Sequence, residues 1–311
     1  MTLVQLQYIV AVDTWRHFAT AAAKCFVTQP TLSMQIHKLE EELGVKLFDR
    51  SKVPVVPTVE GMEIIQQARV VLKEAERLGE IVRERKGEMV GEIRLGILPT
   101  LAPYLLPLFL NSFLQRYPSI RLNITELTTE AIVERLKKNL LDAGLLATPL
   151  HEAGMFEQPL FYEEFVVYVS PAEPAYHKRY VLADDIDVRH LWLLEEGHCM
   201  RSQIMHLCEL KSRVQGVNNL HYEAGSIETL KKMVELHNGI TILPELALAD
   251  LTAQQQRLVR HFKAPAPVRE ISLVTHRNFV KQRILEALRE EILESVPPRM
   301  RRPGRRELLE L

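Results

Sequence analysis

The sequence predicts an α/β protein in which a mostly helical N-terminal region precedes two α/β lobes. Three observations support this fold class. Residues 1–57 contain short apolar stripes separated by tight turns, which is typical of short packed helices. Residues 58–90 carry one long apolar seam, and residues 91–296 alternate strand-like and helix-like segments. A chain of 311 residues is long enough for two or three such domains.

The composition is that of an ordinary globular protein. Hydrophobic residues make up 47% of the chain and charged residues 25%, which excludes a disordered or collagen-like protein. The first residues lack the basic and apolar regions of a signal peptide, and the apolar residues 101–114 include two prolines and are too few to span a bilayer. With only 3 cysteines, we expect a cytoplasmic protein without structural disulfides and without a membrane partner.

Residues 17–43 predict two short helices joined by a tight turn at residues 26–27. The first helix is rich in alanine. Thr28 is placed to cap the second helix, and Pro30 is tolerated in its first turn because no intrahelical donor is needed there. The predicted buried stripe of the second helix comprises Leu32, Ile36, Leu39 and Leu43. This arrangement is a helix-turn-helix.

The outer face of the second helix carries side chains that can reach base edges and phosphates. We expect DNA contacts from Gln29, Pro30, Thr31, Ser33, Gln35, His37 and Lys38. Candidates for phosphate contacts from a following wing are Lys46, Arg50 and Lys52. Residues 1–60 hold equal numbers of basic and acidic side chains, so one domain alone would have little electrostatic affinity for DNA. Several domains acting together would compensate.

Residues 58–90 predict a linker helix. Its seam alternates spacings of three and four residues, as in a heptad repeat, and comprises Ile65, Ala68, Leu72, Ala75, Gly79 and Val82. A helix this long with a single apolar stripe needs a partner helix. A helix packed within one domain is the alternative. Gly87 and Gly91, which would end the helix just before a strand, favour dimerisation between two domains.

Residues 91–296 predict two lobes with ligand sites where strands end and helices begin. The first strands are expected at 92–98, 122–127 and 142–147, with helices at 101–116 and 130–139 between them. Further strands are expected at 165–170, 191–194, 220–223 and 240–243, helices after 197 and at 226–237, and a last strand and helix within 271–295. This order favours a parallel sheet with right-handed crossovers.

The lobes take their boundaries from this order of segments. We assign residues 91–163 and 269–296 to lobe I, and residues 164–268 to lobe II. Residues 297–311 form a basic tail that we expect to be disordered.

Residues 195–208 contain the most informative chemistry. Cys199 is predicted to start a helix beside His198 and Arg201, a setting that stabilises a thiolate. Cys208 follows nine residues later. On one straight helix the two Cα atoms would lie roughly 13 Å apart. A disulfide needs Cα atoms within about 7 Å, so a bond between them requires the helix to unfold.

Two other interpretations of these cysteines stay open on spacing alone. They could be unrelated buried residues, because free cysteine is often buried. They could also bind a metal together with His198 and His206, although no Cys-x-x-Cys pair is present. We expect no metal and no cofactor. Cys25, which ends the alanine-rich helix, is interpreted as a small core residue.

A longer motif resembles the N-terminal domain of LysR-type transcriptional regulators. It comprises Val27-Thr28-Gln29-Pro30-Thr31-Leu32-Ser33, Ile36, Leu39, Glu40, Leu43-Gly44-Val45, Leu47-Phe48, Arg50, Thr58 and Gly61. The resemblance implies a winged helix-turn-helix at 1–57, a linker helix at 58–90 that pairs two subunits, and a two-lobed, periplasmic-binding-protein-like regulatory domain at 91–296. Val4 departs from the family, which often has a basic residue there.

The sequence Gly197-His198-Cys199-Met200-Arg201, with Cys208, resembles the redox centre of hydrogen-peroxide-sensing members of that family. Residues 96–107, 228–230 and 239–244 agree with these members. The resemblance implies that Cys199 is the peroxide-attacking thiolate, that Cys208 resolves it to a disulfide, and that a cellular dithiol reductant reverses the bond. The residues implied for the peroxide pocket or for tuning the thiolate are Thr100, Thr129, His198, Arg201 and Arg269. Val268 stands where the family has a basic residue.

The function expected from this resemblance is that of a transcription activator, not an enzyme, which controls oxidative-defence genes. It would bind promoter DNA, hydrogen peroxide and RNA polymerase, and would act as a homodimer or homotetramer. The main alternative is a regulator of the same family that responds to a small-molecule effector in the cleft between the lobes, with incidental cysteines. A thiol peroxidase is a further alternative.

Overall fold

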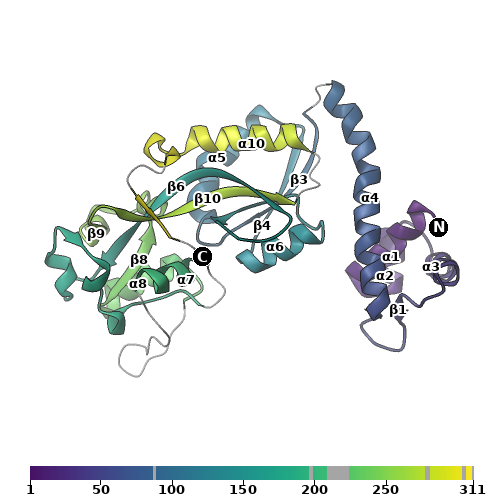
Figure 1. The fold of residues 1–311 in the computed structure, drawn as a ribbon, viewed down its shortest axis with the longest axis horizontal. Helices are drawn as coiled ribbons and strands as arrows, with labels where there is room; N and C mark the ends of the chain where they lie inside the picture. Colours follow the sequence, from purple (N-terminus) through teal and green to yellow (C-terminus); the bar gives the residue numbers. More distant parts are fainter. Residues whose placement is uncertain (87–88, 196–198, 209–223, 277–280, 303–305, 310–311) are drawn as a thin grey trace. The chain divides into compact units, whose positions relative to one another are not determined.

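The computed structural model describes residues 1–86, 89–195, 199–208, 224–276, 281–302 and 306–309 (Figure 1). They fold into two compact units, Met1–Glu88 and Met89–Leu311. Within the described ranges, the structure contains no helix with enough length and hydrophobicity to cross a membrane.

The N-terminal unit combines helices with a small hairpin. Helices α1 (Leu3–Trp15), α2 (Phe18–Lys24) and α3 (Gln29–Leu43) precede the strands β1 (Phe48–Asp49) and β2 (Val56–Pro57). The two strands pair antiparallel, and the long helix α4 (Val59–Lys86) follows. The predicted helix-turn-helix is confirmed as α2 and α3, and the hairpin occupies the place of the wing.

Helix α3 is stabilised at both ends. The hydroxyl of Thr28 accepts a hydrogen bond from the Thr31 N–H at 3.4 Å, and Pro30 occupies the first turn, as predicted. Gly44 ends the helix in a left-handed conformation with φ 71°. The stripe of Leu32, Ile36 and Leu39 is fully buried. Leu43 was predicted with them but is 37% exposed, because it is the last helical residue before the chain turns at Gly44.

Helix α4 is packed along only part of its length. Ile65 and Ala68 are buried in the core of the unit, where α4 contacts α1, and Leu72 packs at the edge of this core. Farther along, Val82 of the predicted seam is 53% exposed, and Leu78, which lies outside the seam, is 70% exposed. The first part of the predicted seam therefore packs within its own unit, whereas its last residue is exposed.

The C-terminal unit is built on a mixed sheet. Its first strands, β3 (Gly91–Ile97), β4 (Ile120–Glu126) and β5 (Ala143–Thr148), are mutually parallel and alternate with α5 (Ala102–Arg116) and α6 (Thr129–Lys137). The sheet continues from β5 through β10 (Ala266–His276), β6 (Met155–Val169) and β9 (Val259–Phe262) to β7 (Tyr180–Val181). The expected parallel order holds for β3, β4 and β5, but β10 runs antiparallel to both β5 and β6, so the sheet as a whole is mixed.

Strands β6 and β10 connect the two lobes (Figure 1). Residues 155–164 of β6 pair antiparallel with β10, and residues 165–169 pair with β8 (Ile240–Pro244). Lobe II also contains α7 (Cys199–Leu207), α8 (Ile227–His237) and α9 (Ala253–Gln256), and α10 (Gln282–Ser295) follows β10. Side chains on these shared strands are therefore placed to contact both lobes.

One predicted strand of lobe II is absent as a regular element. Residues 191–194 make only single bridges, from Leu191 to Ile240 and from Leu194 to Ala224. The four side chains are nevertheless buried, so an apolar run marked burial and not a regular strand. The strand predicted at 220–223 lies outside the described residues.

The C-terminal tail is ordered where the structure describes it, so the prediction of disorder was wrong there. Met300, in the 3₁₀ helix η6 (Pro298–Arg301), is fully buried, and Arg299 pairs with Glu245 at 2.6 Å. Strand β11 (Arg306–Leu308) pairs in parallel with residues 266–268 of β10, and Leu309 is buried after it. Disorder was predicted from the basic composition of the tail, and the two apolar residues that anchor it, Met300 and Leu309, were overlooked.

Candidate redox site and nucleic-acid interface

Helix α7 carries a cysteine at each end. Cys199 is the first residue of α7, as predicted, and its side chain is buried. The N–H of Cys208 still donates to the Ile204 carbonyl at 3.0 Å, so the helical hydrogen bonds reach both cysteines. Both thiols are free. A straight helix of this length separates the two Cα atoms by about 13 Å, so they cannot bond in this fold.

Burial is the main influence on the Cys199 thiol, and it raises the pKa above its ordinary value. The hydroxyl of Thr129, the charge of Arg269 and the backbone N–H of Met200 each lower this pKa, whereas the charge of Glu130 raises it. The net direction is upward. Removal from water therefore opposes the thiolate that the sequence predicts, whereas Thr129, Arg269 and the Met200 N–H favour it.

Of the two neighbours expected to tune Cys199, only Arg201 lies among the described residues. Arg201 donates a hydrogen bond to the Leu194 carbonyl at 2.6 Å, which directs one guanidinium nitrogen to the backbone. His198 lies outside the described residues. Among the described residues, charged side chains that act on the Cys199 thiol include Arg269, on β10, and Glu130, on α6.

Thr129 contributes a hydroxyl that its own helix does not use. Thr128, not Thr129, caps α6, because its hydroxyl accepts from the Ala131 N–H at 3.4 Å. The Thr129 hydroxyl is buried and has no hydrogen bond of ordinary geometry among the described residues, yet it acts on the Cys199 thiol. The arrangement argues against a mere capping role for Thr129.

Arg269 is fully buried and sits in a network that includes Thr100. On the paired strands, Arg269 lies directly opposite Glu163, and its Nη2 is 2.8 Å from the Glu163 Oε2. The other Glu163 oxygen accepts from the Leu246 N–H at 2.8 Å. The Arg269 Nη1 donates to the Thr100 hydroxyl at 3.1 Å. Sequence reasoning missed Glu163, because its role depends on strand pairing.

These groups bring two hydroxyls and a fixed cation close to a buried thiol. An arginine has no acceptor, so the Thr100 hydroxyl must accept from Arg269, which leaves its own hydrogen to be donated elsewhere. Thr100 follows β3, Thr129 begins α6, Cys199 begins α7 and Arg269 lies on β10. Hydroxyl donors and a fixed cation are suited to stabilising negative charge that develops on oxygen.

Burial also affects the remaining two cysteines. Burial raises the pKa of Cys208 to about 11, so its thiol is protonated at neutral pH. Cys25 packs at the edge of the core of the N-terminal unit, in agreement with its interpretation as a core residue. Burial raises the pKa of Cys25 as well.

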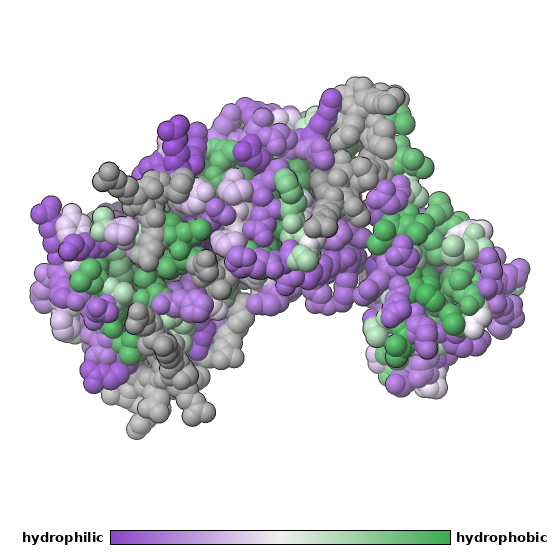
Figure 2. Space-filling model, in the orientation of Figure 1, coloured by the Kyte–Doolittle hydropathy of each residue, from purple (hydrophilic) through white to green (hydrophobic). Residues whose placement is uncertain are grey.

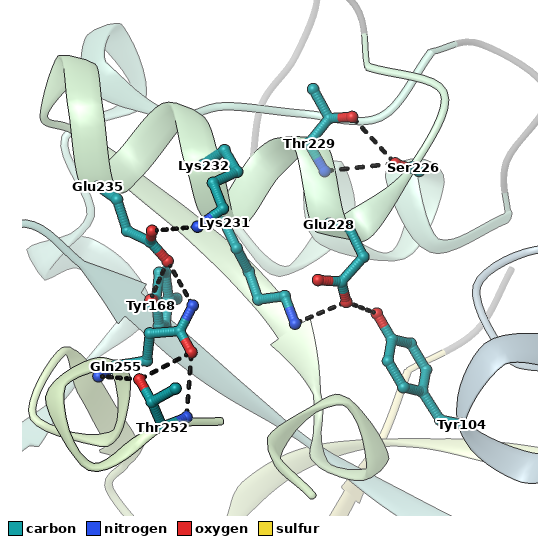
Figure 3. Close-up of polar contacts among 10 residues, drawn as sticks. All are labelled: Tyr104, Tyr168, Ser226, Glu228, Thr229, Lys231, Lys232, Glu235, Thr252 and Gln255. Carbon is teal, nitrogen blue, oxygen red and sulfur yellow. Dashed lines mark hydrogen bonds and ion pairs between the residues drawn. The ribbon is translucent and has the colours of Figure 1, made fainter. Parts of the chain in front are cut away.

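The two lobes also contact each other directly through polar side chains (Figure 3). Tyr104 of α5 donates to the Glu228 Oε1 of α8 at 2.7 Å, and the Lys231 Nζ lies 2.6 Å from the same oxygen. Burial and this hydrogen bond raise the pKa of Tyr104, so the phenol remains a donor. Here polar side chains that face each other from the two lobes are paired by a hydrogen bond.

A surface cavity lies elsewhere in the regulatory unit. Phe156, His276 and Arg283 line part of this cavity, near β10 and α10. The cavity includes none of the residues predicted for the peroxide pocket. No group of three or more His, Cys, Asp or Glu side chains that could hold a metal ion occurs within the described ranges.

Most predicted DNA-contacting residues of α3 are accessible. Those that are exposed are Gln29, Pro30, Thr31, His37 and Lys38. Ser33 and Gln35 are half-buried. The Gln35 Oε1 accepts from the Gln5 Nε2 at 3.3 Å, so its amide is held toward α1.

Arg50 connects the hairpin to α3. Its Nη1 donates to the Ser33 hydroxyl at 3.1 Å, and its Nη2 pairs with the buried Glu40 at 3.3 Å. The guanidinium also lies over the Phe18 ring. These contacts position the hairpin, in addition to any contact with a phosphate. Lys52 extends further into solvent, with a side chain that is 65% exposed.

Two exposed apolar residues of this unit were not predicted. Met34 is 51% exposed and lines a shallow depression on α3 together with Pro30 and Lys38. Phe26, in the turn before α3, is 95% exposed and adopts a left-handed backbone conformation with φ 56°. Figure 2 shows apolar side chains gathered on the visible surface of this unit. The sequence did contain a signal for these two residues, because each is an apolar residue within an otherwise polar motif.

Comparisons with known proteins agree for both units. Residues 3–62 match the family "Bacterial regulatory helix-turn-helix protein, lysR family", and residues 86–297 match "LysR substrate binding domain". The chain is 35% identical to the "Hydrogen peroxide-inducible genes activator" of Haemophilus influenzae, over 88% of this chain and 90% of that protein. It is also 35% identical to the "HTH-type transcriptional regulator EstR" of Acinetobacter baylyi, over 89% of this chain and 91% of the other.

A similar solved structure is the full-length OxyR of Pseudomonas aeruginosa with a cysteine-to-aspartate substitution. It has a TM-score of 0.80 and 33% identity, and the match covers 95% of this chain and 99% of that one.

Proposed function

The chain belongs to the LysR family of helix-turn-helix transcriptional regulators, and we propose that it senses hydrogen peroxide through Cys199 and Cys208. One observation carries this proposal. Cys199 is buried at the start of α7, beside the buried hydroxyl of Thr129, which has no hydrogen bond of ordinary geometry among the described residues, and Cys208 follows at the other end of the same helix. The names of similar proteins support the choice of peroxide as the signal.

In the first step Cys199 reacts with peroxide. Its sulfur attacks one peroxide oxygen, an S–O bond forms, and the O–O bond breaks. Sulfur is oxidised to a sulfenic acid, and the departing oxygen leaves as water with the proton of the thiol. The hydrogen of Thr100, the hydroxyl of Thr129 and the charge of Arg269 stabilise the negative charge on the departing oxygen. His198 and Arg201 remain proposed tuning residues, and neither is needed for the balance of this step.

In the second step Cys208 resolves the sulfenic acid. Helix α7 must unfold first, and unfolding also removes the burial that raises the pKa of Cys208 to about 11. The Cys208 thiolate then attacks the Cys199 sulfur, the S–S bond forms, the S–O bond breaks, and hydroxide leaves and takes up a proton. A cellular dithiol reductant restores both thiols by exchange. Refolding of α7 then returns the reduced state.

The output is a change in DNA binding. Unfolding of α7 alters the surface of the regulatory unit, and paired subunits carry this change to their DNA-binding units. Apolar residues exposed along α4, such as Leu78 and Val82, are suited to contact a second copy. Promoter DNA is contacted by α3 and the hairpin through Gln29, Pro30, Thr31, Ser33, Gln35, His37, Lys38, Arg50 and Lys52. A homotetramer in the cytoplasm that recruits RNA polymerase completes the proposal.

The decisive experiment maps thiols by mass spectrometry before and after brief exposure to one equivalent of peroxide. We expect Cys199 and Cys208 to be lost as free thiols and Cys25 to remain, and we expect the Cys199→Ser variant to lose the peroxide response on promoter DNA. A variant that still responds would exclude this sensor. Sustained turnover far above one peroxide per subunit would indicate a peroxidase. A need for an organic effector would indicate the regulator with a ligand between its lobes.

A further inference from the structure

Gln203 is a buried polar residue between the two cysteines of α7. It is fully buried, and its Nε2 donates a hydrogen bond to the Leu309 carbonyl at 3.1 Å. Its Oε1 is buried without a hydrogen-bond partner among the described residues. Among the described residues, the one hydrogen bond that this side chain makes therefore links α7 to the backbone of a segment far along the chain.

The partner of Gln203 belongs to the C-terminal segment, residues 306–309. This segment pairs in parallel with residues 266–268 of β10, and the Leu309 N–H donates to the Val268 carbonyl at 2.9 Å. Leu309 is itself buried. The backbone of Leu309 therefore bonds to β10 with its N–H and to α7 with its carbonyl. The C-terminal segment holds α7 to the sheet at the residue before Arg269.

We propose that Gln203 is a positioning residue for disulfide formation: it fastens α7 to the C-terminal segment, which slows the approach of Cys208 to Cys199. The proposal rests on the proposed function, since it concerns the second step of the peroxide reaction. The segment is released when α7 unfolds, because the Gln203 amide then no longer reaches the Leu309 carbonyl.

The size of the effect follows from the length of α7. A helix of nine residues is marginal in isolation, so its contacts with the rest of the unit determine how often it unfolds. The net contribution of one intramolecular hydrogen bond corresponds to a factor of about 2 to 10 in such an equilibrium. Loss of the Gln203 contact should speed disulfide formation by a factor in this range, if unfolding of α7 limits the rate.

The coupling must be reciprocal. If the C-terminal segment stabilises the helical form of α7, then formation of the disulfide loosens the segment by the same factor. Oxidised protein should therefore expose residues 306–309 more often than reduced protein does.

The test uses the full chain and two variants that remove the same contact from opposite sides. Gln203→Met keeps the volume of the side chain but cannot donate, and a chain that stops after Arg305 lacks the acceptor. Gln203→Met should form the Cys199–Cys208 disulfide about 2 to 10 times faster than the wild type after peroxide. The truncated chain, which also loses the buried Leu309 and its pairing with β10, should be at least as fast as Gln203→Met. Adding Gln203→Met to the truncated chain should give no further increase, because the Gln203–Leu309 hydrogen bond is already absent there. Ser202→Ala, at an exposed position of α7, is the matched control and should react as the wild type does.

A second measurement separates this role from a general structural one. Sulfenic acid formation, trapped chemically in a Cys208→Ser background, should be unchanged by both variants, because the contact acts only after the first step. Carboxypeptidase should release residues beyond 305 faster from oxidised than from reduced protein. If the wild type forms no Cys199–Cys208 bond, the proposed function fails. If it forms the bond and both variants do so at the wild-type rate, the role of Gln203 is overturned.

Discussion

Helices α3 and α7 both begin at a residue proposed to act in sensing or recognition, but they are stabilised in opposite ways. Helix α3 has 15 residues, a threonine cap at its start and a left-handed glycine at its end. Helix α7 has nine residues and contains the buried, half-satisfied Gln203. In α3 the apolar face packs in the core and the polar face is left for DNA. In α7 the buried face both packs in the core and carries the reactive Cys199.

The difference shows that the two sites require different stabilities of their helices. A recognition helix works by keeping one shape, so stabilising contacts and function do not compete. A sensing helix that must unfold has to combine enough contacts for a defined reduced state with few enough for release. The following predictions probe this contrast from the largest expected effect to the smallest.

The largest effect is expected at the buried charge pair behind the redox site. Arg269→Met leaves the Glu163 carboxylate buried without its cation, which should cost about 3–5 kcal/mol in the free energy of unfolding. It should also slow the reaction of Cys199 with peroxide. Chemical denaturation of the reduced chain measures the cost. The matched control is Arg189→Met, whose side chain is 81% exposed beside Asp187 and should contribute little. Equal costs for the two variants would contradict a special role for the buried pair.

An intermediate effect is expected from pH on the reduced regulatory unit. Burial raises the pKa of Cys208 from 9.0 to about 11, so the folded state holds the proton more tightly than the unfolded state does. This contribution is complete below pH 9 and is lost as pH rises toward 11, which amounts to at most about 3 kcal/mol. Unfolding measured from pH 8 to 11 should show this loss, and Cys208→Ser should remove part of it. A slope unchanged in Cys208→Ser would refute the assignment.

The smallest effect is expected at the cap of α3. Thr28→Ala removes the hydroxyl that accepts from the Thr31 N–H and should destabilise the N-terminal unit by about 1 kcal/mol. Thr28→Ser keeps a hydroxyl and should restore most of the stability. Thermal unfolding followed by circular dichroism compares the three proteins. Equal destabilisation by alanine and serine would show that the methyl group, not the cap, stabilises the start of α3.

The sequence predicted those features of the structure that neighbouring residues determine. The cap at Thr28, the start of α7 at Cys199 and the order of β3, β4 and β5 all follow from local patterns, and the structure contains them. The motif around the cysteines led to Thr100 and Arg269, which the structure brings together. Short-range signals were therefore sufficient for the framework of the fold and for part of the site.

The residues that sequence did not reveal act through distant partners. Glu163 bonds to Arg269, and Gln203 bonds to Leu309, and in each case the partner lies 106 residues away. Neither a glutamate in a strand nor a glutamine in a helix signals burial by its type. The ordered tail was missed for a related reason, since Leu309 becomes an anchor only beside β10.

The pairing of Arg269 with Glu163 also limits how this protein can change over evolutionary time. Each charge is fully buried opposite the other on adjacent strands, so a lineage that loses one of them carries an uncompensated ion in its interior. Such an intermediate is less stable than either the complete pair or an apolar replacement of both. Homologues should therefore keep both residues or replace both, and the two positions should covary even though they lie 106 residues apart in the sequence.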